Sequence, residues 1–266
     1  MILNMKTLII NLTLIISFIF SLPSFAQQEN INRLDEDGDR TGLWKKYYDN
    51  GKLKYEGNFE DDKPVGLMKR YFREGPLSAQ IDFRKDGNTS YATMYYRSGK
   101  KAAEGKFLGQ KKDSVWNYYS FYNGRLAITE EWENGEKDGL TKKYYDDGRV
   151  AEITEWQDGV KTGVWEQYYE NGQLRLKSSH LDGNREGSFK SYNPNGSPSI
   201  EGNYTDGVMH GTWKYYTENG QPDVTVEYDQ GKMMANPEIK KRQEEFSDQL
   251  DEAVGDFPEP NPGGLR

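Results

Sequence analysis

Aromatic stretches that end in glycine recur along the chain at an almost constant distance. They read YYDNG, YFREG, YYRSG, SFYNG, YYDDG, YYENG, YNPNG and YYTENG, and they end at Gly51, Gly75, Gly99, Gly124, Gly148, Gly172, Gly196 and Gly220. The steps between these glycines are 24, 24, 25, 24, 24, 24 and 24 residues. A fixed period of this length indicates one supersecondary unit stacked on copies of itself. We therefore expect eight units.

Within each unit the pattern of apolar and polar positions predicts two strands. After the first glycine, apolar residues alternate with polar ones, as in LKYEGNF at 53–59 and LSAQIDF at 77–83. Alternation with period 2 indicates a strand with one preferred face. The Asn-Gly and Asp-Gly pairs predict hairpin turns whose two central residues both take positive φ. About 16 strands then form an all-β, elongated, single-layer antiparallel β-meander on the order of 75 Å long.

The start of the chain has a different character. Residues 1–26 combine a lysine, an apolar run and small residues at the end, which is typical of a secretory signal peptide cleaved between Ala26 and Gln27. The alternative is a retained membrane anchor, although the run from Leu8 is only marginally long enough to span a bilayer. We expect an exported protein, periplasmic or extracellular. Residues 27–40 then form a lead-in with a partial repeat.

The end of the chain also leaves the repeat, whose array we place at 41–234. Residues 235–254 contain good helix formers with apolar positions near helical spacing. They predict a C-terminal α-helix that caps the open edge of the last hairpin, because repeat arrays need such protection. Residues 255–266 are rich in proline and glycine and are expected to be a disordered tail.

Composition narrows the range of partners. Hydrophobic residues make up only 34% of the chain, yet aromatic residues reach 14%, which favours strand-surface contacts over a thick core. The chain has no cysteine, which excludes disulfides, thiolate metal sites and a lipoprotein anchor. Without residues 1–26 it has 34 basic and 43 acidic residues, a net charge of −9. That charge disfavours nucleic acid and anionic membrane surfaces as partners.

The two histidines occupy ordinary repeat positions. His210 precedes a unit-starting glycine, where other units have Thr, Val, Asp or Glu, so the position is a tolerant turn. His180 shares its position with tryptophans and tyrosines of other units and replaces a ring in an aromatic column. We interpret both histidines as structural.

No catalytic or metal-binding constellation stands out from the repeat. The stretch LDEDGD at 34–39 resembles part of a calcium loop, but Arg33 and Trp44 stand where a calcium loop needs acidic ligands. It is better interpreted as one more hairpin turn. A G-x-S-x-G motif and zinc-ligand clusters are absent, and no carboxylate pair departs from the repeat register. We expect no enzyme activity, no cofactor and no metal.

The stretch EGNYTDGVMHGTWKYYTENG at 201–220 resembles a MORN repeat, and residues 55–75 are similar, with Asp62 at an expected turn glycine. The 24-residue spacing and the WxxYYxNG core resemble the bacterial MORN-variant proteins of the YwqK-type antitoxin family. This resemblance implies an elongated, twisted single-layer sheet that contacts proteins or, in some members, lipids. It implies no catalytic residues.

Three interpretations of function follow. The first is a non-catalytic protein-binding scaffold, because the repeat supplies surface and no chemistry. The second, implied by the resemblance, is an antitoxin or immunity protein that neutralises a toxin, and a signal peptide counts against it unless that toxin acts outside the cytoplasm. The third is a glycan- or envelope-binding module that uses exposed aromatic rows.

Adjacent tyrosines recur in most units, and neighbours on a strand point to opposite faces. Trp165 and Tyr169 should therefore share one face, with Tyr168 on the other. One aromatic column is then available for binding, or all the rings simply stabilise a sheet that has no second layer.

One unit breaks the rules of the repeat. Ser90 and Ser114 replace unit-starting glycines, and one extra residue lies between Gly99 and Gly124, which predicts a β-bulge. This unit concentrates five rings, Trp116, Tyr118, Tyr119, Phe121 and Tyr122. Our hypothesis is that they form the main contact surface for a partner. The alternative is neutral drift in a tolerant array.

Overall fold

The computed structural model describes residues 30–234, 241 and 244–248. The expectations for the signal peptide, for its cleavage between Ala26 and Gln27, and for the tail 255–266 concern residues outside this part. Among the described residues, no helix has the length and apolar character needed to cross a bilayer.

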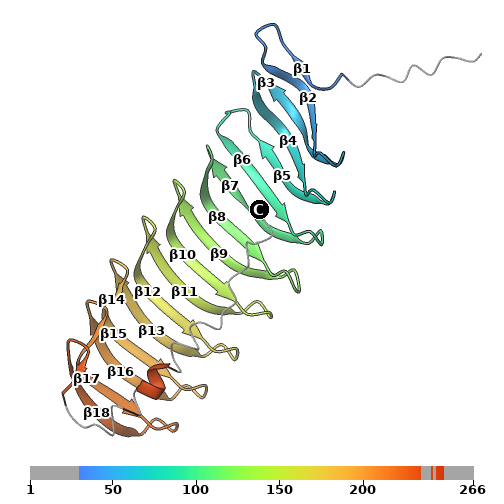
Figure 1. Cartoon of the computed structure of the whole chain (residues 1–266). Coiled ribbons are helices and arrows are strands. Elements are labelled where there is room, and N and C mark those ends of the chain that lie inside the picture. Colours follow the sequence, from blue (N-terminus) through green and yellow to red (C-terminus); the bar gives the residue numbers. More distant parts are fainter. Residues whose placement is uncertain (1–29, 235–240, 242–243, 249–266) are drawn as a thin grey trace, which may run out of the picture.

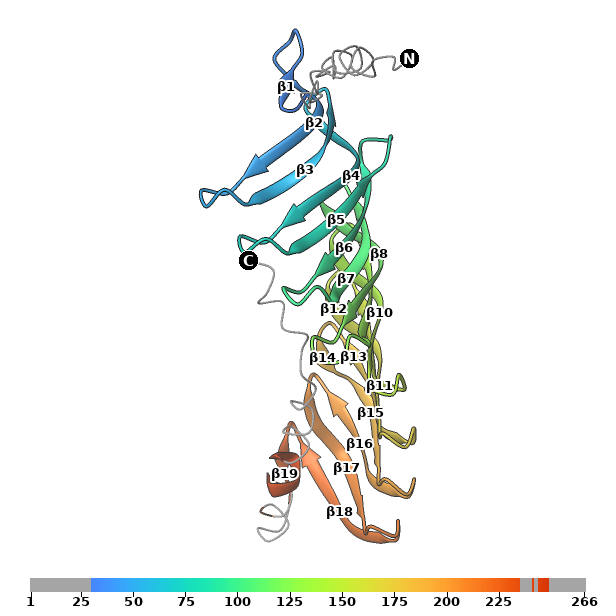
Figure 2. The same ribbon diagram turned by 90° about the vertical axis from the view of Figure 1, so that its right-hand side faces the viewer.

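The described chain forms one open sheet of 19 antiparallel strands (Figure 1). Each strand pairs with the next along the chain, except that β14 and β15 both pair with β13. The strands are β1 (Arg33–Leu34), β2 (Arg40–Tyr47), β3 (Leu53–Glu60), β4 (Lys63–Tyr71), β5 (Leu77–Phe83), β6 (Thr89–Tyr95), β7 (Lys101–Leu108), β8 (Lys111–Tyr119), β9 (Leu126–Glu133), β10 (Glu136–Tyr144), β11 (Val150–Gln157), β12 (Val160–Tyr168), β13 (Leu174–Leu181), β14 (Asn184–Arg185), β15 (Gly187–Tyr192), β16 (Pro198–Thr205), β17 (Val208–Tyr216), β18 (Pro222–Asp229) and β19 (Lys232–Met233). β1, β14 and β19 have two residues each, and the other 16 have six to nine. The predicted elongated meander is confirmed, and its strands rotate progressively along the array (Figure 2).

The hairpins use two kinds of turn, one at each edge of the sheet. At the second-turn edge, Asp158-Gly159 and four counterparts from Asn134-Gly135 to Gln230-Gly231 have positive φ at both residues, as predicted. At Asp37-Gly38 and Asp86-Gly87 only the glycine has positive φ, so the prediction is wrong for these two turns. At the first-turn edge, the YYxNG edge, the Gly51 N–H donates to the carbonyl of Tyr48, and of the Asn50-Gly51 pair only the glycine has positive φ. This is a three-residue turn whose last residue is left-handed. The expected two-residue Asn-Gly turn is therefore wrong at this edge.

The unit-starting glycines share a left-handed backbone, with positive φ at each of them. Gly139 has a φ of +101° where the β9–β10 register shifts, and Glu131 Oε2 accepts a hydrogen bond from the Leu140 N–H at 2.9 Å. Ser114 keeps the left-handed backbone at this position, with a φ of +59°. Ser90 does not, and β5 pairs with β6 without a register shift. Ser114 thus keeps the backbone conformation of the repeat at this position, whereas Ser90 does not.

The core consists of one face of the sheet, which we call the tryptophan face because Trp116, Trp165 and Trp213 are buried on it. It contains two apolar clusters, one around Trp116 and one that extends from Trp165 to Tyr228. Side-chain volumes are complementary between neighbouring strands. A Cβ added at Gly202 would lie 2.2 Å from the Trp213 ring, and one at Gly105 would lie 2.3 Å from the Trp116 ring. Glycine therefore stands where the next strand places a large ring.

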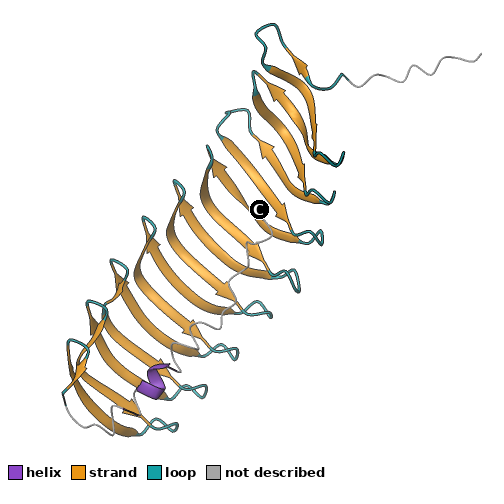
Figure 3. Cartoon of the chain, in the orientation of Figure 1, coloured by secondary structure: helices purple, strands orange, loops and turns teal. Residues whose placement is uncertain are grey.

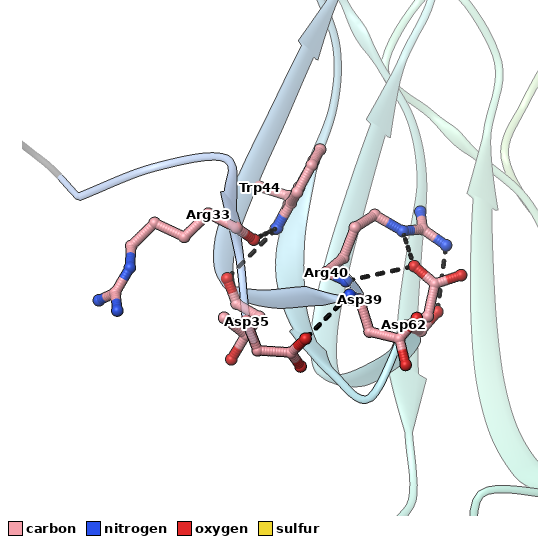
Figure 4. Close-up of polar contacts among 7 residues, drawn as sticks. Arg33, Asp35, Asp39, Arg40, Trp44 and Asp62 are labelled. Carbon is pink, nitrogen blue, oxygen red and sulfur yellow. Dashed lines mark hydrogen bonds and ion pairs between the residues drawn. The ribbon is translucent and has the colours of Figure 1, made fainter. Parts of the chain in front are cut away.

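The N-terminal hairpin is closed by local polar contacts (Figure 4). Asp35 Oδ1 accepts hydrogen bonds from the N–H groups of Asp37 and Asp39, at 3.1 and 2.9 Å. Trp44 Nε1 donates to the carbonyl of Arg33, and Arg40 forms an ion pair with Asp62 of the next hairpin. The acidic side chains of LDEDGD thus order a turn between β1 and β2, as predicted.

A short helix at 244–248 lies within the predicted helical range (Figure 3). Phe246, its one residue that is not exposed, packs against the apolar cluster of the tryptophan face. It lines a pocket with side chains from Tyr169 to Ser199, before the last hairpin. The helix therefore covers the face of the sheet, and the expectation that it caps the last edge is wrong. An amphipathic turn buries more apolar surface on a face than along an edge strand.

Candidate functional site

A column of cations lies on the tryptophan face beside the second-turn edge. Its members precede the unit-starting residue by two positions and are Arg40, Lys112, Lys137, Lys161 and Arg185. Lys137 Nζ is 4.7 Å from the centre of the Trp156 ring, and the Arg185 guanidinium is 5.2 Å from that of Trp165. The backbone fixes the spacing of this column, since second-turn glycines donate to the carbonyl of a column member in the preceding unit, as Gly159 does to Lys137 and Gly183 to Lys161.

Lys112 is the most enclosed of these cations. Its ammonium group is 4.4 Å from the ring centre of Trp132, 5.0 Å from that of Trp116 and 5.1 Å from that of Tyr118. It also donates a hydrogen bond to the Tyr118 hydroxyl at 2.6 Å. Burial lowers the pKa of Lys112 and raises that of Tyr118. The aromatic box is thus filled by the chain's own lysine, which stabilises it by cation–π attraction.

Buried polar residues separate the two apolar clusters of the tryptophan face. We call the four of them on β9–β11 the polar strip: Glu130, Thr141, Glu152 and Thr154. Glu130 is paired with Lys137 at 2.6 Å, and Glu152 with Lys143 at 3.3 Å. These ion pairs satisfy the carboxylates without a ligand. Within the described ranges, no group of three or more acidic or histidine side chains is arranged to hold a metal ion.

The histidines lie where the repeat places them. The ring of His180 is 5.5 Å from that of Trp165, and burial lowers the pKa of His180. His210 is half exposed, with Nδ1 3.7 Å from Asp229 Oδ1. His180 therefore packs as one more ring of the aromatic column, as predicted. His210 pairs with Asn203 within β17, so the predicted turn at this position is wrong, although the side chain is exposed.

The opposite face carries the tyrosine that ends the first strand of each unit, as Tyr71 ends β4 and Tyr119 ends β8. Tyr71 donates to Glu56 at 2.8 Å, Tyr119 donates to Glu104, and Tyr216 donates to Glu201 at 3.0 Å. Burial, together with the bonded carboxylate, raises the pKa of Tyr71 and of Tyr119 to about 12. These hydroxyls cross-link neighbouring strands and are not free for binding.

The residue after each strand-ending tyrosine forms a column along the first-turn edge. Tyr48, Tyr96, Tyr145 and Tyr169 each donate to the backbone carbonyl of the residue 23 positions later, and so join one unit to the next. We call the full set the edge column: Tyr48, Phe72, Tyr96, Ser120, Tyr145, Tyr169, Asn193 and Thr217. The column lacks a ring at Ser120 and again from Asn193 onward.

The five predicted site rings do not form one surface. Trp116 is fully buried in the core, Tyr118 contacts Lys112 on the same face, and Tyr119 donates to Glu104 on the opposite face. Phe121 and Tyr122 lie in the turn after β8, with 50% and 85% of their surface exposed. The structure therefore brings together only the last two as an accessible pair.

The extra residue of this unit lies in the turn and not in a strand. The Ser120 N–H donates to the carbonyl of Arg125, five positions on, whereas Tyr48 donates to Lys52, four positions on. A register shift between Tyr118 and Tyr119 does occur, but the other units have the same shift, as between Lys46 and Tyr47. The predicted special bulge is therefore wrong, because a longer turn absorbs an insertion without changing the strand register.

Sequence reasoning missed two features. The cation column has a readable signal, a basic residue two positions before the unit-starting glycine or serine in five units. The gap in the edge column also has one, because Ser120 interrupts a run of aromatic residues at the same repeat position. The same stretch that is rich in rings, 116–122, therefore also contains the position that lacks one.

Comparison with known proteins supports the assignment of the repeat. The profile of the MORN repeat variant family matches residues 40–61, 161–182, 185–206 and 209–230. No curated protein matches the chain.

Two solved structures are similar to the chain. One is the crystal structure of TcdB2-TccC3-TEV, with 15% identity over 76% of this chain and 12% of that chain, and a TM-score of 0.20. The other is that of TcdB2-TccC3-Cdc42, with 12% identity over 71% of this chain and 14% of that chain, and a TM-score of 0.17. This chain thus spans 12% and 14% of the lengths of those two chains.

Proposed function

We propose that this chain, which is built from repeats of the MORN repeat variant family, is a non-catalytic scaffold that binds another protein. MORN repeats are generally protein- or membrane-binding modules and are a non-catalytic repeat type.

The observation that carries the proposal is the exposed ring pair Phe121–Tyr122. Tyr122 exposes 85% of its surface, and its ring contacts Phe121 edge-on at 5.6 Å. The regular turns replace this pair with polar residues such as Asp49 and Asn50. Exposed aromatic pairs lose solvation at little conformational cost on binding, which makes them frequent interface anchors.

A protein partner is favoured over the other partner classes. The net charge of −8 for the whole chain opposes binding to nucleic acid and to anionic lipid. Glycan binding relies on flat, open aromatic rows, whereas the tryptophans of the core face are buried or face lysines. The partner could be a toxin that the scaffold neutralises. This antitoxin function is a narrower form of the same proposal.

The test is capture of a partner by the chain from Gln27 onward, using envelope extract. Phe121→Ser/Tyr122→Ser should reduce recovery of the captured protein several-fold, because the anchor rings are lost while the turn keeps its polar character. Leu181→Ser, which removes an exposed apolar side chain at the opposite edge, is the matched control and should capture normally. Equal recovery by all three proteins would remove the ring pair from the interface.

Export is a separate part of the proposal, and it rests on the sequence of residues 1–26. The mature N-terminus should be Gln27, so the intact mass of the exported protein should correspond to residues 27–266. A mass that retains Met1 or Met5 would show that the segment is kept, and the protein would then be anchored.

A further inference from the structure

The chain itself shows what its edge column accepts. The column loses its ring at Asn193, and there the C-terminal helix supplies one. Phe246 lines a pocket of about 210 Å³ together with Tyr169, Ser191 and Asn193. It also packs against the apolar cluster of the tryptophan face. A phenylalanine from the C-terminal segment thus lies beside Asn193, one of the column positions that has no ring of its own.

The gap in the column at Ser120 has no such phenylalanine from the C-terminal segment among the described residues. Phe121 covers part of the gap, with its ring 5.1 Å from that of Tyr96 and nearly perpendicular to it. Half of the Phe121 surface nevertheless stays exposed, and Tyr122 is more exposed still. Exposed rings beside a vacant position in an aromatic column form a receptor for one further ring.

We propose that the chain's own segment 249–266 docks along the first-turn edge of the tryptophan face and places Phe257 at the Ser120 gap. From β15, which ends beside Asn193, to β8, which ends beside Ser120, there are six strand spacings, or about 29 Å. Phe257 follows Phe246 by 11 residues. Two residues in helical geometry and nine in extended geometry span about 33 Å, so Phe257 reaches the gap at Ser120.

The composition of the segment favours this extended docking. Pro258, Pro260 and Pro262 alternate with other residues, and each fixes φ near the extended range. The segment therefore loses less conformational entropy on docking than an unrestricted chain would.

Complementary charges also favour docking of the segment along this edge. The acidic residues Asp251, Asp256 and Glu259 would pass between Arg175, which lines the Phe246 pocket, and Arg125, which ends the Ser120 turn. Opposite charges along the path fix the direction of the segment more than they add affinity.

Docking of the segment does not require a partner protein. Its regulatory consequence does rest on the proposed function, because a partner that binds Phe121–Tyr122 would compete with Phe257 for the same turn. Removal of the segment would then raise the affinity for the partner, as expected when an intramolecular competitor is lost.

The absence of native cysteine allows a clean cross-linking experiment on the full chain. Asn123→Cys in the Ser120 turn is paired with Glu259→Cys, two residues after Phe257. The matched control pairs Glu259→Cys with Gln110→Cys, an exposed turn residue at the other end of β8. Under mild oxidation at low protein concentration, the first pair should form an intrachain disulfide at least several-fold faster than the control. Addition of Phe257→Ser should remove the difference.

Each other outcome overturns the proposal. Equal rates for the two pairs, or no cross-link in either, would show that the segment does not dock at this turn. Disulfides formed only between chains would assign the gap to a second copy. A selective cross-link that survives Phe257→Ser would remove Phe257 as the anchor. Because no partner is present, none of these results depends on the proposed function.

Discussion

At the scale of single residues, Ser90 and Ser114 occupy the same repeat position and have opposite backbone demands. Ser114 is left-handed, with a φ of +59°, whereas Ser90 is buried in a regular ladder between Phe83 and Phe107. A left-handed backbone costs a non-glycine residue about 1–2 kcal/mol, and glycine within a strand costs about 0.5–1 kcal/mol. Ser114→Gly should therefore stabilise the protein by about 1 kcal/mol, and Ser90→Gly should destabilise it by a similar amount.

Urea unfolding monitored by tryptophan fluorescence measures both variants, and each serves as the control for the other. Two shifts of the same sign would show that the backbone conformation at this position does not decide its residue preference.

At the scale of strands and turns, the repeat period predicted the strands and their pairing. It did not predict the turn types, because these depend on local hydrogen bonds. Alternation at 53–59 and the glycine spacing were enough to predict the strands, their order and the antiparallel pairing. The turn type at Asn50-Gly51 could not be read, because Asn-Gly is compatible with two-residue and three-residue turns and hydrogen bonding at Tyr48 decides between them. Similarly, five rings within seven residues do not reveal that the chain turns between Tyr119 and Phe121.

The tyrosine–carboxylate bonds of the opposite face predict a loss of stability in alkali. The pKa of Tyr71, Tyr119 and Tyr168 is raised to about 12, mainly by burial and then by the bonded glutamate. Because the folded pKa lies above the ordinary value of 10, the stability contributed by these groups is present below pH 10 and is lost between pH 10 and 12. Tyr119→Phe should be less stable than the unmodified protein at pH 8, and the difference should shrink at pH 11.5.

Urea midpoints at the two pH values give the comparison. Tyr122→Phe, a change at the exposed ring of the turn, is the control and should keep the pH dependence of the unmodified protein. A Tyr119→Phe deficit that stays constant between pH 8 and pH 11.5 would rule out the hydroxyl as the titrating group.

At the scale of the whole molecule, we expect the polar strip to divide the array into two blocks that open separately. One apolar cluster centres on Ala92, Ala103 and Trp116, and the other extends from Trp165 to Tyr228. Between them, β9–β11 bury Glu130 and Glu152 in ion pairs, which contribute less net stability than apolar contacts of the same area. The stability of a repeat array is close to the sum of the stabilities of its repeats and of the interfaces between neighbours. The weakest interface therefore lets the repeats on its two sides open independently.

Hydrogen exchange of two core variants tests this division. Loss of a buried tryptophan costs about 3–5 kcal/mol, equivalent to a change of roughly 10²- to 5 × 10³-fold in exchange rates governed by opening of the block. Trp116→Ala should therefore accelerate exchange in β6–β8 by that factor and leave β15–β18 unchanged, while Trp213→Ala should do the reverse. Acceleration of the same size at both ends in either variant would mean that the 16 long strands open as one unit, and the polar strip would then couple the clusters and not separate them.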